Sequence, residues 1–94
     1  MDRIDELLIK MFEEKKKKGI ITIEGFEPDV IMGVLCYRVY ENPSFVYRRY
    51  IDDTEWSMLE YSEDFRHTFV DCVISDIKMH MLLKGMNPSD YWEV

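Results

Sequence analysis

The sequence predicts an α+β fold, with an N-terminal helix, a three-stranded antiparallel meander, and one or two C-terminal helices packed on one face of the sheet. Three observations support this prediction. Apolar residues recur at helical spacing over residues 2–18. After Gly19 the pattern changes to β-branched residues, beginning with 20–23. A second, longer helical stripe then covers 65–83. The 94 residues suit a single domain spanning 1–94.

The first predicted helix, over residues 2–18, has charges that match its dipole. Acidic residues occupy the first turns, and the lysines of 15–18 occupy the last turn. Gly19 then stands where a left-handed conformation is least costly. We therefore expect the lysine run to cap a helix rather than to bind phosphate.

Residues 30–41 are consistent with either a helix or a strand. Gly33 would cost a helix interior about 1 kcal/mol. The following segment, 45–51, is a strand candidate, and residues 42–44 (Asn-Pro-Ser) form a good turn between two strands. We therefore predict a hairpin, with a helix over 30–41 as the alternative.

Two helices are expected after the sheet. Asp53 is expected to cap a short helix that runs through Glu60, and Ser62 the long helix that ends at 84–85 (Lys-Gly). The long helix is expected to pack on the first one; the predicted contact sets are Phe65, Phe69, Val73 and Ile77 against Leu8, Met11 and Phe12. Residues 86–94 should form an acidic and aromatic tail that exposes Tyr91 and Trp92.

The charge balance restricts the classes of partner. Twelve basic and 19 acidic residues give a net charge of −7, which disfavours direct binding to nucleic acid or to an anionic membrane and favours a basic partner. The N-terminus lacks a signal-peptide pattern, and the longest apolar run, eight residues, is shorter than the roughly 20 needed to span a bilayer. Cys36 and Cys72 lie in apolar segments and are expected to be reduced core thiols. We therefore expect a soluble cytoplasmic protein.

The sequence contains no motif for catalysis, a cofactor or a metal. His67 shares a helical face with Glu63 and Asp71, an arrangement more typical of surface ion pairs than of a metal site. His80 would lie roughly 20 Å farther along the same helix, so the two histidines cannot share a ligand. We predict a protein that is not an enzyme and that has no cofactor or bound metal.

The candidate binding site is the acidic stretch 51–65, which contains six carboxylates and no lysine or arginine. The residues expected to contact a partner are Asp52, Asp53, Glu55, Trp56, Glu60, Tyr61, Glu63 and Asp64. Acidic side chains around aromatic anchors are typical of an interface, with Trp56 as the expected anchor. The alternative is an ordinary solvated face that keeps the protein soluble.

The element order and the acidic run "DDTEWSMLEYSED" resemble the small phage-encoded DNA-mimic inhibitors, which include some anti-CRISPR proteins. The resemblance covers the whole chain in architecture, and no residue motif defines it. It implies a stoichiometric inhibitor that blocks a nuclease or another nucleic-acid enzyme by occupying its basic channel. The lysines of 15–18 and Arg38, Arg48 and Arg49 would then have to face away from the partner.

Two other functions remain open. In the first, the protein is a homo-oligomer such as a homodimer, joined through the hairpin edge or the aromatic tail. In the second, it is a small regulator that binds nucleic acid through the hairpin, where tyrosines at 37, 40, 47 and 50 alternate with arginines. The structural alternative is that these residues only stabilise the hairpin, through cross-strand aromatic pairs and arginines that lie over the rings.

Overall fold

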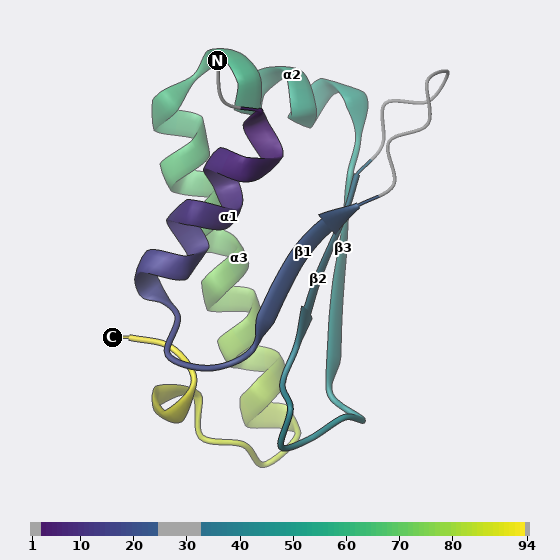
Figure 1. Ribbon diagram of the computed structural model, residues 1–94, viewed down its shortest axis with the longest axis vertical. Coiled ribbons are helices and arrows are strands. Elements are labelled where there is room, and N and C mark those ends of the chain that lie inside the picture. The colour runs from purple at the N-terminus through teal and green to yellow at the C-terminus, as the bar shows by residue number, and fades with distance from the viewer. Residues whose placement is uncertain (1–2, 25–32, 94) are drawn as a thin grey trace.

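The computed structural model describes residues 3–24 and 33–93, and it confirms the predicted α+β fold. The elements follow one another as helix α1 (Ile4–Lys15), strands β1 (Ile20–Glu24), β2 (Gly33–Arg38) and β3 (Val46–Ile51), helices α2 (Asp53–Tyr61) and α3 (Glu63–Leu83), and a short 3-10 helix η1 (Pro88–Asp90). The three strands form an antiparallel sheet in the order β1-β2-β3. Helices α1 and α3 lie on one side of this sheet, and α2 crosses one of its ends (Figure 1).

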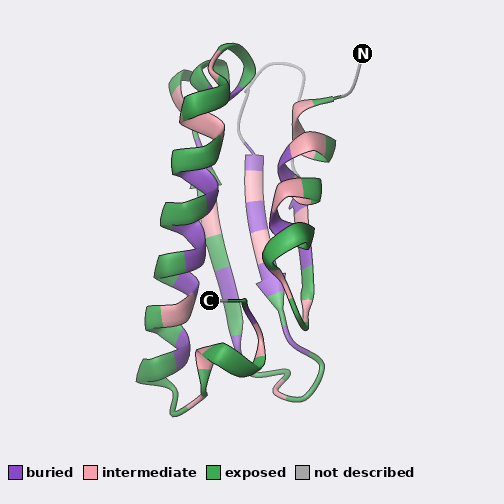
Figure 2. Cartoon of the chain, turned by 90° about the vertical axis from the view of Figure 1, so that its left-hand side faces the viewer, coloured by how far each residue is buried: buried purple, intermediate pink, exposed green. Residues whose placement is uncertain are grey.

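The sheet has a buried face and an open face because side chains alternate along each strand. In β2, for example, Leu35 and Tyr37 are fully buried, whereas Arg38 is exposed. The buried face meets the apolar stripes of α1 and α3, which point inward (Figure 2). Among the described residues, all three helices with α-geometry lie away from the open face (Figures 1 and 2).

The core largely follows the predicted helix contacts. Leu8 and Phe12 of α1 are fully buried, and Phe69, Val73 and Ile77 of α3 are buried as well. Phe65 and Met11 are only partly buried and pack at the edge of this core. The stripe continues to the far end of α3, where Met81 is fully buried while its neighbours Met79 and Leu82 are exposed.

The hairpin over residues 33–51 is confirmed, and the alternative of a helix over 30–41 is wrong for its described part. Gly33 pairs with Ile51 and Arg38 with Val46, so the strands are in register about the turn at 42–44. Residues 30–32, which were also expected to be extended, lie outside the described residues.

The first helix ends three residues earlier than predicted, at Lys15. Lys16–Lys18 are instead held by the C-terminal segment: Lys16 forms a β-bridge with Trp92, and the amides of Lys17 and Lys18 donate to the carbonyl of Tyr91. Gly19, with φ of 106°, has Tyr37 so close that a Cβ would lie 2.6 Å from its hydroxyl oxygen. Backbone pairing therefore replaces the expected helix cap. The predicted helix start at residue 2 lies outside the described residues.

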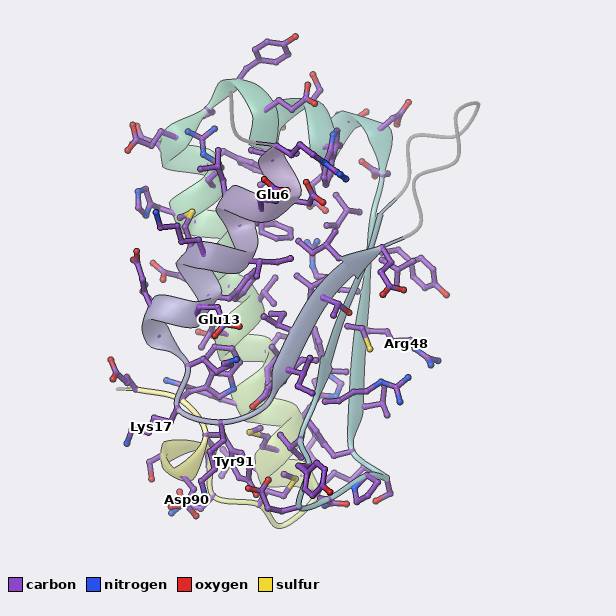
Figure 3. The ribbon with its side chains drawn as sticks, in the orientation of Figure 1. Glu6, Glu13, Lys17, Arg48, Asp90 and Tyr91 are labelled. Carbon is purple, nitrogen blue, oxygen red and sulfur yellow. The ribbon has the colours of Figure 1, made fainter. Side chains whose placement is uncertain are left out.

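The tail is packed against the protein, contrary to the expectation that it exposes both aromatic residues. Trp92 is fully buried, and its ring lies 4.9 Å from that of Tyr37 and 6.5 Å from that of Phe12. Tyr91 is half-buried beside residues 16–18, which we call the lysine segment, and Figure 3 shows it near Lys17. We call residues 91–93 the C-terminal strap, since they join the end of α1 to the core.

Candidate functional site

The acidic stretch forms α2 and the start of α3, at one end of the molecule. Strand β3 leads directly into α2, and the chain turns at Ser62 into α3. Helix α1 begins at this same end (Figure 1), and Figure 3 shows Glu6 of α1 there. We define the acidic pole as the five exposed carboxylate residues of this region: Asp52, Asp53, Glu60, Glu63 and Asp64.

Two of the predicted contact residues have structural roles instead. Trp56 is only 9% exposed and belongs to the core, so the structure revises its expected role as an anchor for a partner. Glu55 accepts two hydrogen bonds from the guanidinium of Arg49, at 2.6 and 3.0 Å. Hydrogen bonding to Glu55 raises the pKa of Arg49 above its ordinary value. Glu55 is therefore paired, and its charge contributes little to the surface.

Other apolar side chains of α2 face outward within the acidic pole. Tyr61 is 85% exposed and Met58 is 47% exposed. The phase of the helix explains the difference, because α2 buries Trp56 and Leu59, three positions apart, and turns the residues between and beyond them to the outside. A helical wheel of residues 53–61 would have separated the buried side chains of α2 from the exposed ones. Met58 is the residue of this site that the sequence analysis did not predict.

The carboxylates of the acidic pole have no lysine or arginine partner among the described residues. Arg66 lies close by, but it donates to the backbone carbonyl of Leu59 at 2.9 Å. Asp52, rather than Asp53, caps α2 by accepting the amide of Glu55 at 2.8 Å, and Ser62 caps α3 as predicted. The pole therefore keeps its charge while several of its members stabilise helix N-termini.

The arginines and tyrosines of the hairpin are divided between the two faces of the sheet. Tyr37 and Tyr47 are buried. Tyr47 donates to Asp76 of α3 at 2.7 Å, and Arg49 lies 4.7 Å from the Phe69 ring. Arg38, Arg48 and Tyr50 lie on the open face, and Figure 3 shows Arg48 directed away from the helices. Tyr40 is also exposed, but it lies in the turn after β2 rather than on a strand. The continuous aromatic platform that nucleic-acid stacking needs is therefore absent from the described hairpin.

The histidines and cysteines form no cluster in the described part of the chain. His67 lies 3.8 Å from Glu63, and His80 lies 3.7 Å from Asp76. Residues 3–24 and 33–93 contain no group of three or more side chains able to hold a metal. Cys36 is half-buried on the sheet and Cys72 is exposed on α3, so the expectation that both are core thiols is wrong.

No family model, no curated protein and no solved structure matches this chain. Within residues 3–24 and 33–93, no helix has both the length and the apolar character required to cross a bilayer.

Proposed function

We propose that this protein is a small non-enzymatic binding protein that docks its acidic pole on a basic protein surface. The observation that carries the proposal is Tyr61, which is 85% exposed among carboxylates that have no described lysine or arginine partner. Tyrosine is enriched at binding hot spots, and Tyr61 shares the exposed side of α2 with Met58. Tyr61 thus takes the anchoring role that the sequence assigned to Trp56.

The arrangement suits a partner that normally binds nucleic acid. The carboxylates sit on two consecutive helices, α2 and α3, and so present several negative charges on a rigid support. A basic channel attracts such charges over about 8 Å at physiological ionic strength. We propose that the protein inhibits a nucleic-acid-processing enzyme stoichiometrically, by occupying the channel in place of phosphates.

A charge comparison tests the acidic pole. The test variant combines Glu60→Gln, Glu63→Gln and Asp64→Asn, which leaves the Asp52 cap intact. The control combines Glu14→Gln, Asp90→Asn and Glu93→Gln, three exposed acids outside α2 and the start of α3. A partner is first captured from lysate on the immobilised wild-type protein, and its binding kinetics to each variant are then measured.

The pole variant should associate about 10-fold more slowly at low salt, with little change in dissociation. The control should associate like the wild type. Tyr61→Ala should instead speed dissociation about 10-fold or more, as expected for an anchor. If the captured partner binds both charge variants equally at low salt, the acidic pole is not the interface. If the protein does not compete with nucleic acid for binding to that partner, the inhibitor mechanism is wrong.

A further inference from the structure

The open face of the sheet carries a hollow that the acidic pole does not explain. Its volume is about 330 Å³, and side chains from all three strands line it. We propose that this hollow binds a small organic anion of the phosphate monoester class. The apolar body of the ligand lies on the sheet, and its phosphate group is held by Arg38 and Arg48.

The floor of the hollow is mostly apolar. Thr22 stands beside Cys36 in the sheet, Val34 lies in the next row, and all three are half-buried. Ile20 stands at the rim and is 62% exposed. Covering such surface removes it from water, so the floor favours a ligand that has an apolar body.

Two arginines stand over one side of the hollow. Among the described residues, no carboxylate lies within ion-pair distance of Arg38 or Arg48, although Arg49 on the other face is held by Glu55. Arg48 pairs with Cys36, two residues before Arg38, so the two arginines are diagonal neighbours on one face. Their Cβ atoms are then about 7–8 Å apart, and two side chains of this length can hold one anion between them.

The charge of this pair selects the anion. A phosphate monoester carries a charge of about −1.5 to −2 near pH 7 and has three strong acceptor oxygens, whereas a carboxylate carries one charge. The planar guanidinium group donates parallel hydrogen bonds that match phosphate oxygens. Two arginines with no described acidic partner therefore suit a phosphate group better than a carboxylate.

The far side of the hollow limits the ligand to a small one. Glu24 pairs with Val34, two rows from Arg38, which is about 13 Å along the strands. Glu24 therefore does not neutralise the arginines, and it repels a second phosphate group. A nucleic acid laid along the sheet would meet Glu24 and then Asp52 and Asp53, which follow β3.

The volume of the hollow sets the size of the ligand body. A cavity of about 150 Å³ is enough for benzene, so 330 Å³ suits one ring together with a phosphate group. Phenyl phosphate is therefore the probe for this site. Because the hollow is open to solvent, we expect a weak affinity, with a Kd of about 1 mM.

Cys36 reports occupancy of the hollow. It lies in the floor, whereas Cys72 is exposed on α3, on the other side of the sheet (Figure 1). Phenyl phosphate at about ten times its Kd should slow alkylation of Cys36 by iodoacetamide about 10-fold, and it should leave Cys72 unchanged. Mass spectrometry of the two peptides measures both rates in one sample, so Cys72 is the internal control.

Two further probes separate the parts of the ligand. Phenol has the ring without the charge, and inorganic phosphate has the charge without the ring. At the same concentration and ionic strength, each should slow alkylation of Cys36 by at most about 2-fold. This difference distinguishes an organic phosphate site from a general anion site.

Substitutions test the arginines. Titration with phenyl phosphate, followed by NMR chemical shifts, should show that Arg38→Gln and Arg48→Gln each raise the Kd at least about 10-fold. Lys10→Gln removes an exposed cation of α1 and should bind like the wild type. Glu24→Gln should bind at least as tightly, because it removes a nearby negative charge. Unchanged melting temperatures would show that the variants fold.

Several results would overturn the proposal. They are an unprotected Cys36, equal protection of Cys36 and Cys72, inorganic phosphate that binds as tightly as phenyl phosphate, and a Kd that Lys10→Gln raises as much as the arginine variants do. A single-stranded oligonucleotide that protects Cys36 at a lower concentration than phenyl phosphate would assign the open face to nucleic acid instead. None of these results bears on the acidic pole, because its carboxylates lie on α2, α3 and the residue before α2.

Discussion

Trp56 and Tyr61 show how position on a helix decides what an aromatic residue does. Both lie in α2 and both are surrounded by acidic residues in sequence. The step of five residues from Trp56 to Tyr61 rotates the side chain by about 140° around the helix, so one ring enters the core and the other reaches solvent. The indole N–H of Trp56 also donates to Glu60 at 3.1 Å, which ties the buried ring to an exposed carboxylate.

The two substitutions should therefore have opposite effects on stability and binding. Trp56→Ala should lower the free energy of unfolding by about 3–5 kcal/mol, because it leaves a cavity in the core. Tyr61→Ala should change it by less than about 0.5 kcal/mol. Urea unfolding followed by circular dichroism measures both. A large loss for Tyr61→Ala would mean that its ring supports the fold rather than a partner.

Tyr37 and Tyr47 should make the protein sensitive to alkaline pH. Burial raises the pKa of both phenols well above the ordinary value, and the hydrogen bond to Asp76 adds to this for Tyr47. A tyrosine in the unfolded chain ionises near pH 10, so above that pH the unfolded state binds fewer protons than the folded state. Stability is therefore full below about pH 10 and falls as the pH rises further.

Replacing either tyrosine with phenylalanine should flatten this fall. Each variant should reduce the slope above pH 10 by up to about 1.4 kcal/mol per pH unit. The exposed Tyr40 provides the control through Tyr40→Phe. Urea unfolding at a series of pH values measures the slopes, and equal slopes for wild type, Tyr37→Phe and Tyr47→Phe would contradict the assignment.

At the scale of elements, the start of α2 joins stability to surface charge. The carboxylate of Asp52 accepts the amide of Glu55, whereas Asp53 contacts only the amide of its neighbour Thr54. We expect Asp52→Ala to cost about 1 kcal/mol, with Asp53→Ala costing less. Asp52→Asn should retain most of the stability, because asparagine also caps helices. Thermal unfolding checks the order, and an equal cost for the two alanine variants would mean that capping is not the cause.

The elements that the sequence predicted correctly are those with local signals. Gly33 and the Asn42-Pro43 turn indicated the hairpin, and Ser62 indicated the start of α3. The end of α1 was wrong because the lysine segment pairs with the strap, a partner distant in sequence. Trp92 was misplaced for the same reason. Local patterns cannot reveal which distant segment completes a core.

The candidate site was predictable only in part. The acidic run located the pole, since charge content is read directly from the sequence. The sequence did not predict which residues of the acidic run are exposed and which are buried or paired. Those differences depend on the orientation of α2 and on the hydrogen bond from Arg49 of β3 to Glu55. The alternation of side chains along β2 and β3 likewise decides which arginines lie on the open face of the sheet.

At the scale of the whole molecule, charge is distributed unevenly. The acidic pole lies at the end where α1 and α3 begin, and the lysine segment lies at the opposite end of α1 (Figures 1 and 3). There Lys16 and Lys18 are paired with Glu13 and Glu41. The acidic pole therefore concentrates five carboxylates that have no described lysine or arginine partner at one end, whereas other exposed acids such as Glu14, Asp90 and Glu93 lie elsewhere. This concentration would help to orient the molecule as it approaches a basic surface.

The strap has a consequence for the order of folding. The hairpin of β2 and β3 closes a loop of a few residues, whereas the bridge between Lys16 and Trp92 closes a loop that spans most of the chain. Closing a longer loop costs more conformational entropy, so contacts of this kind tend to form after the rate-limiting step. We expect the hairpin and the α2–α3 pair to form first, with the strap added last.

Stopped-flow kinetics of Trp92→Leu test this order. The substitution should raise the unfolding rate constant in proportion to the lost stability and leave the folding rate constant nearly unchanged. A fall in the folding rate constant of similar size would place Trp92 in the folding nucleus. If the expectation holds, the strap sets the lifetime of the folded state while the sheet and the paired helices set how fast that state is reached.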